Sequence, residues 1–410
     1  MTIKINKKKI FIYLFSLLVV LPYFGSNIGI SFGEIKINIA DIIIFMYTIR
    51  IILKKNTYKK LKENATEIIE WRLLLLLFIF FIPLGMLNDA SLGEQIRQVR
   101  NVLYIIITYY ILIDNGENIN VIFLIEYISI ISAFDCIIRT FILHSNANWY
   151  QFYRANGVLN VFLFSFLILR IWTMNKKEAL LGVLCCIGLI YSSFLSQERT
   201  QLLTIGIAIV IALVYQINLK LRSLNNLRIK TKVITRGIIF VILASIIVYY
   251  VLQNDFVKKY IDYYVTYRLS NGNLLKGNGI LQRDGSFSAR KLQFNTIFKE
   301  NKNLFYILFG KGTCAHYIAA QGDTYIVDSA ILWIYKDLGI VGTILIIKIF
   351  MNMLKKCQNI KNSSKLSIYI SGISLIIFSI YNPSFIYTSS AAFAFGLYFF
   401  LKYKSIRNNE

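Results

Sequence analysis

Charged residues are scarce in this sequence of 410 residues. Lys, Arg, Asp and Glu together make up 16% of the chain, whereas a soluble globular protein carries roughly 25%. Hydrophobic residues make up 56% and aromatic residues 15%, and the mean hydropathy is +0.58. The shortage of charge argues against an ordinary soluble protein and predicts a protein whose solvent is largely lipid.

Histidine and cysteine are also rare, which bears on metal sites and disulfides. The two histidines, His144 and His316, have no partner at the spacing of metal ligands, so we expect neither a metal nor another cofactor. The five cysteines include no C-x-x-C pair. Only Cys314 is expected outside the membrane and the cytoplasm, so the sequence predicts no disulfide framework.

Acidic residues are outnumbered, with 21 Asp and Glu against 45 Lys and Arg, for a net charge of +24. On a soluble protein this excess would suggest nucleic acid binding. Here the basic residues cluster in segments between apolar runs, as the positive-inside rule describes for membrane proteins. No basic patch alternates with exposed aromatics in a way that suggests base stacking, so we expect no nucleic acid partner.

Apolar runs long enough to cross a bilayer recur along the chain. The first follows Lys4–Lys9 and lacks a small-x-small cleavage site, which is typical of a retained signal anchor. The sequence predicts an all-α polytopic membrane protein with about twelve spans. They lie near residues 10–30, 38–53, 71–87, 101–113, 119–143, 158–173, 179–195, 200–218, 237–253, 330–353, 366–382 and 387–401.

The charges of the connecting segments predict the orientation. With the N-terminus inside, the cytoplasmic segments contain 24 Lys and Arg, and the short outer loops contain 5. This contrast predicts that both termini face the cytoplasm. The chain then divides into a membrane domain at 1–253, a large extracytoplasmic loop of roughly 74 residues at 254–327, and a second membrane domain at 328–410.

This asymmetric organisation favours an enzyme over a transporter. Many transporters consist of two matching halves with broken helices at the membrane midplane, and this pattern shows no clear halves. A large outer loop suits an enzyme that works at the outer membrane surface. A flippase or transporter remains the alternative from another class.

Several arginines are expected on the outer side, against the general charge trend. Arg199 lies in the short turn Ser196-Gln197-Glu198-Arg199-Thr200, at the start of a helix whose N-terminus favours anions. A guanidinium there suits a diphosphate, and the alternative is that it pairs with Glu198 or lipid headgroups. Arg154 lies in Tyr150–Gly157, whose aromatic and amide side chains suit either sugar binding or an interfacial aromatic belt. The other outward arginines are Arg97, Arg100, Arg268 and Arg290.

Two further sites lie in the large loop and at its end. Arg290 opens a predicted amphipathic helix over Arg290–Glu300 that could lie on the membrane. Asp328 precedes the tenth span, where an acid can act as a general base for a sugar hydroxyl or simply cap the helix. Lys336 and Asp337 follow on that helix. Because adjacent helical residues do not face each other, we expect each to have another partner.

These features resemble the O-antigen polymerase and ligase superfamily of bacterial envelopes. Tyr153–Gly157 resembles the family's Arg-x-x-Gly stretch, Ser196–Thr200 its Ser-x-x-Arg turn, and Leu308–Gly312 its "fG-x-G" segment. Gly285-Ser286 with Arg290 resembles its arginine-bearing loop segment. The ligase pattern of His, a polar residue, nine residues, Gly, two residues and Gly is kept from position 328 to Gly342, except that Asp328 replaces the histidine.

The resemblance implies a glycosyltransferase-C-like fold in the bacterial cytoplasmic (inner) membrane. It implies a metal-independent polymerase that joins polyprenyl-diphosphate-linked oligosaccharide repeat units into O-antigen or capsular polysaccharide on the outer face. Arg199 and Arg290 would clamp the diphosphate, and Asp328 would act as base or orient the acceptor. Arg154, Arg97, Arg100 and Arg268 would bind substrate. The partners are the lipid-linked oligosaccharide and membrane lipid, with a chain-length regulator as a further candidate. Ligase-type transfer of finished glycan is the alternative within the family.

Overall fold

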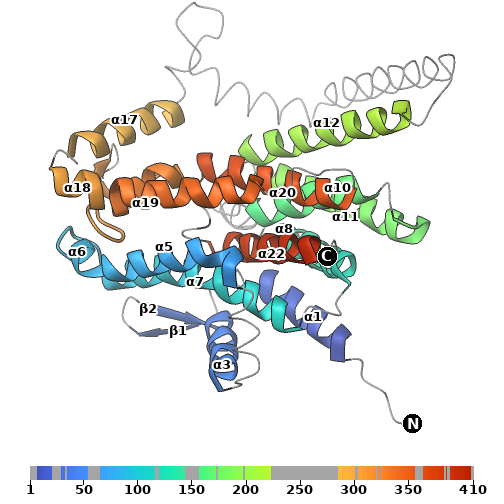
Figure 1. Ribbon diagram of the computed structural model, residues 1–410, viewed down its shortest axis with the longest axis horizontal. Coiled ribbons are helices and arrows are strands. Elements are labelled where there is room, and N and C mark those ends of the chain that lie inside the picture. The colour runs from blue at the N-terminus through green and yellow to red at the C-terminus, as the bar shows by residue number, and fades with distance from the viewer. Residues whose placement is uncertain are drawn as a thin grey trace, which may run out of the picture. The chain divides into compact units, whose positions relative to one another are not determined.

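The computed structural model describes most, but not all, of the chain. The described residues are 7–20, 29–32, 35–53, 65–115, 120–143, 157–171, 174–196, 199–222, 285–300, 303–319, 322–324, 326–355, 363–382, 385 and 388–407. They form fourteen α-helices, one short 3-10 helix and two antiparallel hairpins (Figure 1). The helices are α1 (Lys7–Val20), α3 (Ile39–Leu53), η1 (Ala65–Ile68), α5 (Ile69–Phe80), α6 (Ile82–Met86), α7 (Leu92–Asn115), α8 (Val121–Leu143), α10 (Gly157–Arg170), α11 (Lys176–Ser196), α12 (Arg199–Arg222), α17 (Gly285–Glu300), α18 (Leu304–Phe309), α19 (Ala330–Lys355), α20 (Ser363–Tyr381) and α22 (Ser389–Arg407).

Long apolar helices dominate this part of the chain and suggest a membrane protein. Three segments are long and apolar enough to cross a bilayer, namely Leu92–Asn115, Thr200–Ile217 and Ala330–Leu354. Shorter apolar helices occur at Gly157–Arg170 and Lys365–Tyr381. The expectation of a helical membrane protein is therefore confirmed at this level, and the number of spans stays a prediction.

The hydropathy of the sequence predicted the positions of most helices, but it predicted their first and last residues less accurately. Ten of the twelve predicted spans coincide with helices or with the α5–α6 pair, and the span at 237–253 lies outside the described residues. The first predicted span is wrong at its end. Its helix α1 ends at Val20, and residues 29 and 30 belong instead to strand β1 (Gly29–Phe32), which pairs with β2 (Ile35–Asn38) in the register Gly29↔Asn38 and Phe32↔Ile35.

The chain divides into two compact units. Unit 1 comprises residues 1–209, 301–316 and 325–410, and unit 2 comprises residues 210–300 and 317–324. In unit 1, the helices α10, α19 and α20 lie above α5, α7 and α22 in the view of Figure 1. Residues 301–316 of the predicted outer loop therefore belong to the same unit as the helices of the membrane domain.

Small residues and side-chain hydrogen bonds bring the helices of unit 1 together. A Cβ on Gly396 of α22 would lie 2.6 Å from Cβ of Thr108 on α7, so only glycine permits this approach. The amide of Asn160 on α10 donates to Ser192 Oγ on α11 at 2.8 Å and accepts from Ser132 Oγ on α8 at 2.6 Å. Such bonds stabilise helix contacts where apolar burial alone gives no preference for one partner.

Unit 2 contains α17 and the hairpin of β3 (Tyr317–Ala319) and β4 (Gly322–Thr324), and α17 contacts β3. The predicted start of the loop helix is wrong, because α17 begins at Gly285 and places Arg290 inside the helix. Ile297 is buried, while the tilted rings of Phe294 and Phe298 have centroids 4.4 Å apart and remain exposed.

Candidate functional site

A break in helix α19 lies beside a group of buried polar residues in unit 1, among them Gln98, Lys336 and Asp337. Gly339 adopts φ 61° and ψ −153°, which no α-helix contains. The break frees the carbonyls of Lys336 and Asp337 from their usual helical donors. The loop after α18 satisfies them instead, because Lys311 N donates to Lys336 O at 2.8 Å and Gly312 N donates to Asp337 O at 3.0 Å.

Glycine is required where this loop meets the helices. Gly310 and Gly312 have φ of +73° and +101°, which strains any residue with a Cβ. A Cβ on Gly312 would lie 2.1 Å from Gly85 N, and a Cβ on Gly339 would lie 2.4 Å from the carbonyl carbon of Leu308. The Gly310–Gly312 motif therefore has a packing role, since its backbone lies directly against two helices.

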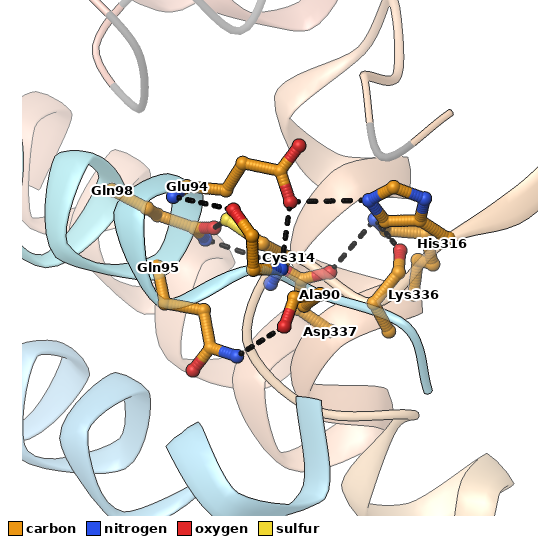
Figure 2. Close-up of polar contacts among 10 residues, drawn as sticks. Ala90, Glu94, Gln95, Gln98, Cys314, His316, Lys336 and Asp337 are labelled. Carbon is orange, nitrogen blue, oxygen red and sulfur yellow. Dashed lines mark hydrogen bonds and ion pairs between the residues drawn. The ribbon is translucent and has the colours of Figure 1, made fainter. Parts of the chain in front are cut away.

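Asp337 is the centre of a buried hydrogen-bond network (Figure 2). Its Oδ2 accepts from Gln98 Nε2 at 2.9 Å, from Cys314 N at 3.0 Å and from Trp333 Nε1 at 3.0 Å. Its Oδ1 lies 3.0 Å from Lys336 Nζ, and both side chains are at most 1% exposed. The donors come from α7, α19 and the loop, so this carboxylate fixes the three to one another.

Lys336 compensates the buried negative charge. Its ammonium donates to Ala315 O and lies 5.6 Å from the ring centroid of Trp333. The expectation that Lys336 and Asp337 each have another partner is confirmed, but the expectation that they do not face each other is wrong. The reason is that both side chains turn towards the same loop segment, Cys314 and Ala315, which needs a donor and an acceptor.

Gln98 and Cys314 complete the buried hydrogen-bond network. The Cys314 thiol donates to Gln98 Oε1, while the amide nitrogen of Gln98 donates to Asp337. Burial raises the pKa of the Cys314 thiol well above its usual range, and the nearby carboxylate of Asp337 raises it further. Cys314 is therefore a protonated donor within the network and not a nucleophile.

Glu94 and His316 lie beside this network (Figure 2), and both side chains are partly exposed. His316 Nε2 is 3.1 Å from Glu94 Oε2, with side-chain exposures of 19% and 21%. Glu94 also forms a capping box with Ser91, in which Ser91 N donates to Glu94 Oε2 at 3.0 Å and Glu94 N donates to Ser91 Oγ at 3.3 Å. A carboxylate held in this way can orient an imidazole, which is a common arrangement for proton transfer.

Arg97 and Arg100 lie on the first turns of α7 and not in a loop before it. The span was predicted to begin at residue 101, and the helix begins at Leu92 because the Ser91–Glu94 capping box starts it there. Arg100 pairs with Asp41 of α3 at 3.0 Å, and Tyr104 donates to the same carboxylate. Arg97 is close enough to Cys314 to lower the pKa of the thiol, which opposes the larger effect of burial.

Three more predicted site residues lie on or beside the helices α19, α12 and α17. Asp328 is half-buried immediately before α19, where Ser329 O accepts from Trp333 N at 2.8 Å and so begins the helix. Arg199, in unit 1, is the first residue of α12. Arg290, in unit 2, lies on α17. The structure describes the backbone of both residues. Arg154 and Arg268 lie outside the described residues.

The comparison with known proteins assigns no family to this chain. No model of a protein family matches the sequence, and no curated protein matches it. The function of this chain is therefore inferred from its own residues and their geometry.

The network of Gln98, Cys314 and His316 was not foreseen from the sequence. Two signals pointed in its direction, namely the charged pair Lys336 and Asp337 inside an apolar helix and the Gly310–Gly312 motif. Charges in such helices usually have a partner or a function. The partners themselves could not be found, because Gln98 and Asp337 are 239 residues apart in sequence.

Proposed function

We propose that this protein is a membrane-embedded glycosyltransferase. In this proposal it joins polyprenyl-diphosphate-linked oligosaccharide repeat units into O-antigen or capsular polysaccharide on the outer face of the bacterial cytoplasmic membrane. One observation supports it most. Glu94, which pairs with His316, is in the first turn of the long apolar helix α7, and Asp328 lies two residues before the long apolar helix α19. The Gly310–His316 loop is hydrogen-bonded to both helices through Cys314.

This arrangement suits a lipid-linked substrate. The two apolar helices would be embedded in the hydrocarbon, and by the charge-derived orientation their N-terminal ends reach the outer surface. A lipid diphosphate headgroup lies at that depth. Rigid elements around the polar groups would hold the acceptor in position and exclude water, which is how an enzyme favours transfer over hydrolysis.

The proposed reaction moves the growing glycan from one carrier to the next unit. The acceptor hydroxyl oxygen attacks the anomeric carbon of the donor, and the bond from that carbon to the diphosphate oxygen breaks. The electron pair leaves with the diphosphate, and the hydroxyl proton passes to Asp328. Arg199 and Arg290 stabilise the charge that develops on the leaving group, and Arg154 and Arg268 help to bind the substrate.

Arg97 and Arg100, both predicted to bind substrate, differ in their contacts. Arg100 is already paired with Asp41, so its contribution is to the packing of α3 against α7. Arg97 lies one turn earlier on the same helix and acts electrostatically on Cys314. It keeps its predicted role in substrate binding, and an Arg97→Ala change is expected to reduce activity.

The glycosyltransferase-C-like fold and the twelve spans belong to this proposal. Ligase-type transfer of finished glycan stays the alternative within it. The spacing from Asp328 to Gly339 and Gly342 does not separate the two, because both glycines have packing roles. Gly339 breaks the helix, and a Cβ on Gly342 would lie 2.3 Å from Leu338 Cβ.

The test is complementation of a clean deletion with single-site variants, followed by the size distribution of surface polysaccharide. Arg199→Ala, Arg290→Ala and Asp328→Asn are expected to leave single repeat units, while the wild type restores a ladder. Lys177→Ala is the matched control, because Lys177 is exposed at the start of α11 and expected on the cytoplasmic side.

Each outcome separates the candidate functions. Complete polymer retained on its lipid carrier in the deletion would indicate a ligase. Loss of lipid-linked units from the outer face would indicate a flippase. If Arg199→Ala and Arg290→Ala both gave normal ladders at normal protein levels, the proposed diphosphate clamp would be wrong.

A further inference from the structure

An open groove lies along unit 1 between α5 and α19. Its volume is about 690 Å³, which is within the usual size range of small-molecule sites, roughly 300–1,000 Å³. Leucine, isoleucine, valine and phenylalanine side chains line it, and a single charged residue occurs in its wall. The lining includes Leu73, Leu76 and Phe80 from α5 and Ile344, Leu345 and Lys348 from α19.

The charged residue is at one end of this apolar surface. Lys348 is 60% exposed, and its Nζ forms a long ion pair with Glu70 Oε1 at 3.6 Å. The same Glu70 oxygen accepts from Asn352 Nδ2 at 2.7 Å, and the Glu70 side chain is only 8% exposed. Asn352 and Lys348 therefore share this carboxylate oxygen, and most of the Lys348 side chain stays exposed and can meet a second anionic group.

The position of Lys348 within α19 makes this exposure informative. The apolar span Ala330–Leu354 includes it, six residues before the end of the span, or about 9 Å along the helix axis. A lysine at this depth is costly in hydrocarbon unless its stem extends along apolar surface and its ammonium meets polar or negatively charged groups. Glu70 meets this condition on the inner side of the ammonium, and an anionic headgroup would meet it on the exposed side.

We propose that the groove between α5 and α19 binds an anionic phospholipid. One acyl chain lies along the leucine, isoleucine and phenylalanine side chains, and the phosphate accepts from the ammonium of Lys348. Basic pockets between membrane helices on the cytoplasmic side commonly bind acidic headgroups. By the charge-derived orientation, Lys348 is at that side, where residues 354–365 add four further lysines.

This lipid site is separate from the proposed glycosyl transfer, which concerns the opposite ends of α7 and α19. It does not depend on the catalytic proposal. A polyprenyl phosphate would offer similar chemistry. The proposal commits to a phospholipid, because the lysine end of the groove faces the leaflet away from the proposed transfer site.

The experiment measures lipid binding by the purified full-length protein in nanodiscs and by native mass spectrometry. The probes are phosphatidylglycerol, phosphatidylcholine with the same acyl chains, and a polyprenyl monophosphate. We expect phosphatidylglycerol to bind at least five-fold more tightly than phosphatidylcholine, which corresponds to about 1 kcal/mol for one basic residue at an anionic surface. Lys348→Gln should abolish that preference, and Lys348→Arg should keep it.

Two more variants distinguish the contribution of the apolar groove to lipid binding from that of the Lys348 charge. Leu76 is 61% exposed in the groove, so Leu76→Trp fills the groove without disturbing the core and should weaken phosphatidylglycerol binding with Lys348 intact. Lys177→Gln, at the start of α11 and outside the groove wall, is the control and should change nothing. Equal binding of both phospholipids, a preference that survives Lys348→Gln, or binding of the polyprenyl phosphate alone would each overturn the proposal.

Discussion

At the scale of single residues, the buried pair Lys336 and Asp337 determines how the candidate site is held. Both charges are removed from solvent, and the carboxylate has four polar partners within 3.0 Å. Such a pair gives little net stability compared with apolar residues of similar size. Removing one partner, however, leaves an uncompensated buried charge. The pair therefore contributes chiefly to the position of the loop that carries His316.

Neutralising only the carboxylate is expected to be strongly destabilising. Asp337→Asn leaves the Lys336 ammonium buried without its counterion, and should lower stability by about 3–5 kcal/mol. Thermal unfolding of the purified protein in detergent measures this loss. The double change Lys336→Met with Asp337→Leu removes both charges and should recover much of it. An Asp337→Asn protein as stable as the wild type would contradict this account.

The thiol of Cys314 gives a second prediction at the residue scale. Its raised pKa keeps it protonated between pH 7 and 9, and its contact with Gln98 Oε1 keeps it inside the network. A variant that retains only this cysteine should resist alkylation in that pH range and react fully after denaturation. Rapid native labelling that increases with pH would show that the thiol is accessible and would argue against the buried network.

At the scale of elements, hydropathy predicted the helices of the described chain but not their interruptions. A run of about twenty apolar residues is a strong local signal, so α8, α11, α19 and α20 begin and end within a few residues of the prediction. The break at Gly339 and the start of α7 at Leu92 were missed. Both depend on specific contacts, a packed loop in one case and a capping box in the other, which add little to average hydropathy.

Two glycines, one in α19 and one in α12, provide a matched test of the break. Gly339→Ala forces a Cβ towards the Leu308 backbone at a positive φ, and is expected to cost at least about 2 kcal/mol. Gly206 lies in α12, and no atom approaches within 4 Å of the place that a Cβ would occupy there. Gly206→Ala should therefore be neutral or stabilising by up to about 1 kcal/mol. Equal unfolding midpoints for the two variants would mean that the helix break is not required.

At the scale of the whole molecule, composition established the class, while long-range contacts formed the site. Scarce charge and repeated apolar runs predicted a helical membrane protein, and three long apolar helices agree with this. The site itself joins residues more than 200 positions apart, as in the bonds from Asn88 to Lys311 and from Cys314 to Gln98. No local pattern encodes such pairings. The sequence therefore pointed to outward arginines, but not to the network that supports the Glu94–His316 pair.

The Glu94–His316 pair offers a test of how unit 1 serves the proposed reaction. If the pair positions the acceptor, His316→Ala should lower the rate of transfer by about ten-fold or more with little change in stability, because both side chains are partly exposed. Glu94→Gln keeps a hydrogen-bonding group at the start of α7 and should have a smaller effect. Polymer yield per folded protein in membranes measures both. Full activity of His316→Ala would assign the pair a purely structural role.

The central claim is that the protein joins lipid-linked repeat units. The most direct measurement supplies the purified full-length protein in nanodiscs with one defined polyprenyl-diphosphate-linked repeat unit, and follows the glycan length by mass spectrometry. Products of two or more units, with one free polyprenyl diphosphate released for each bond formed, are expected from the wild type and not from Asp328→Asn. Unchanged single units from an active preparation that still binds the substrate would contradict the claim.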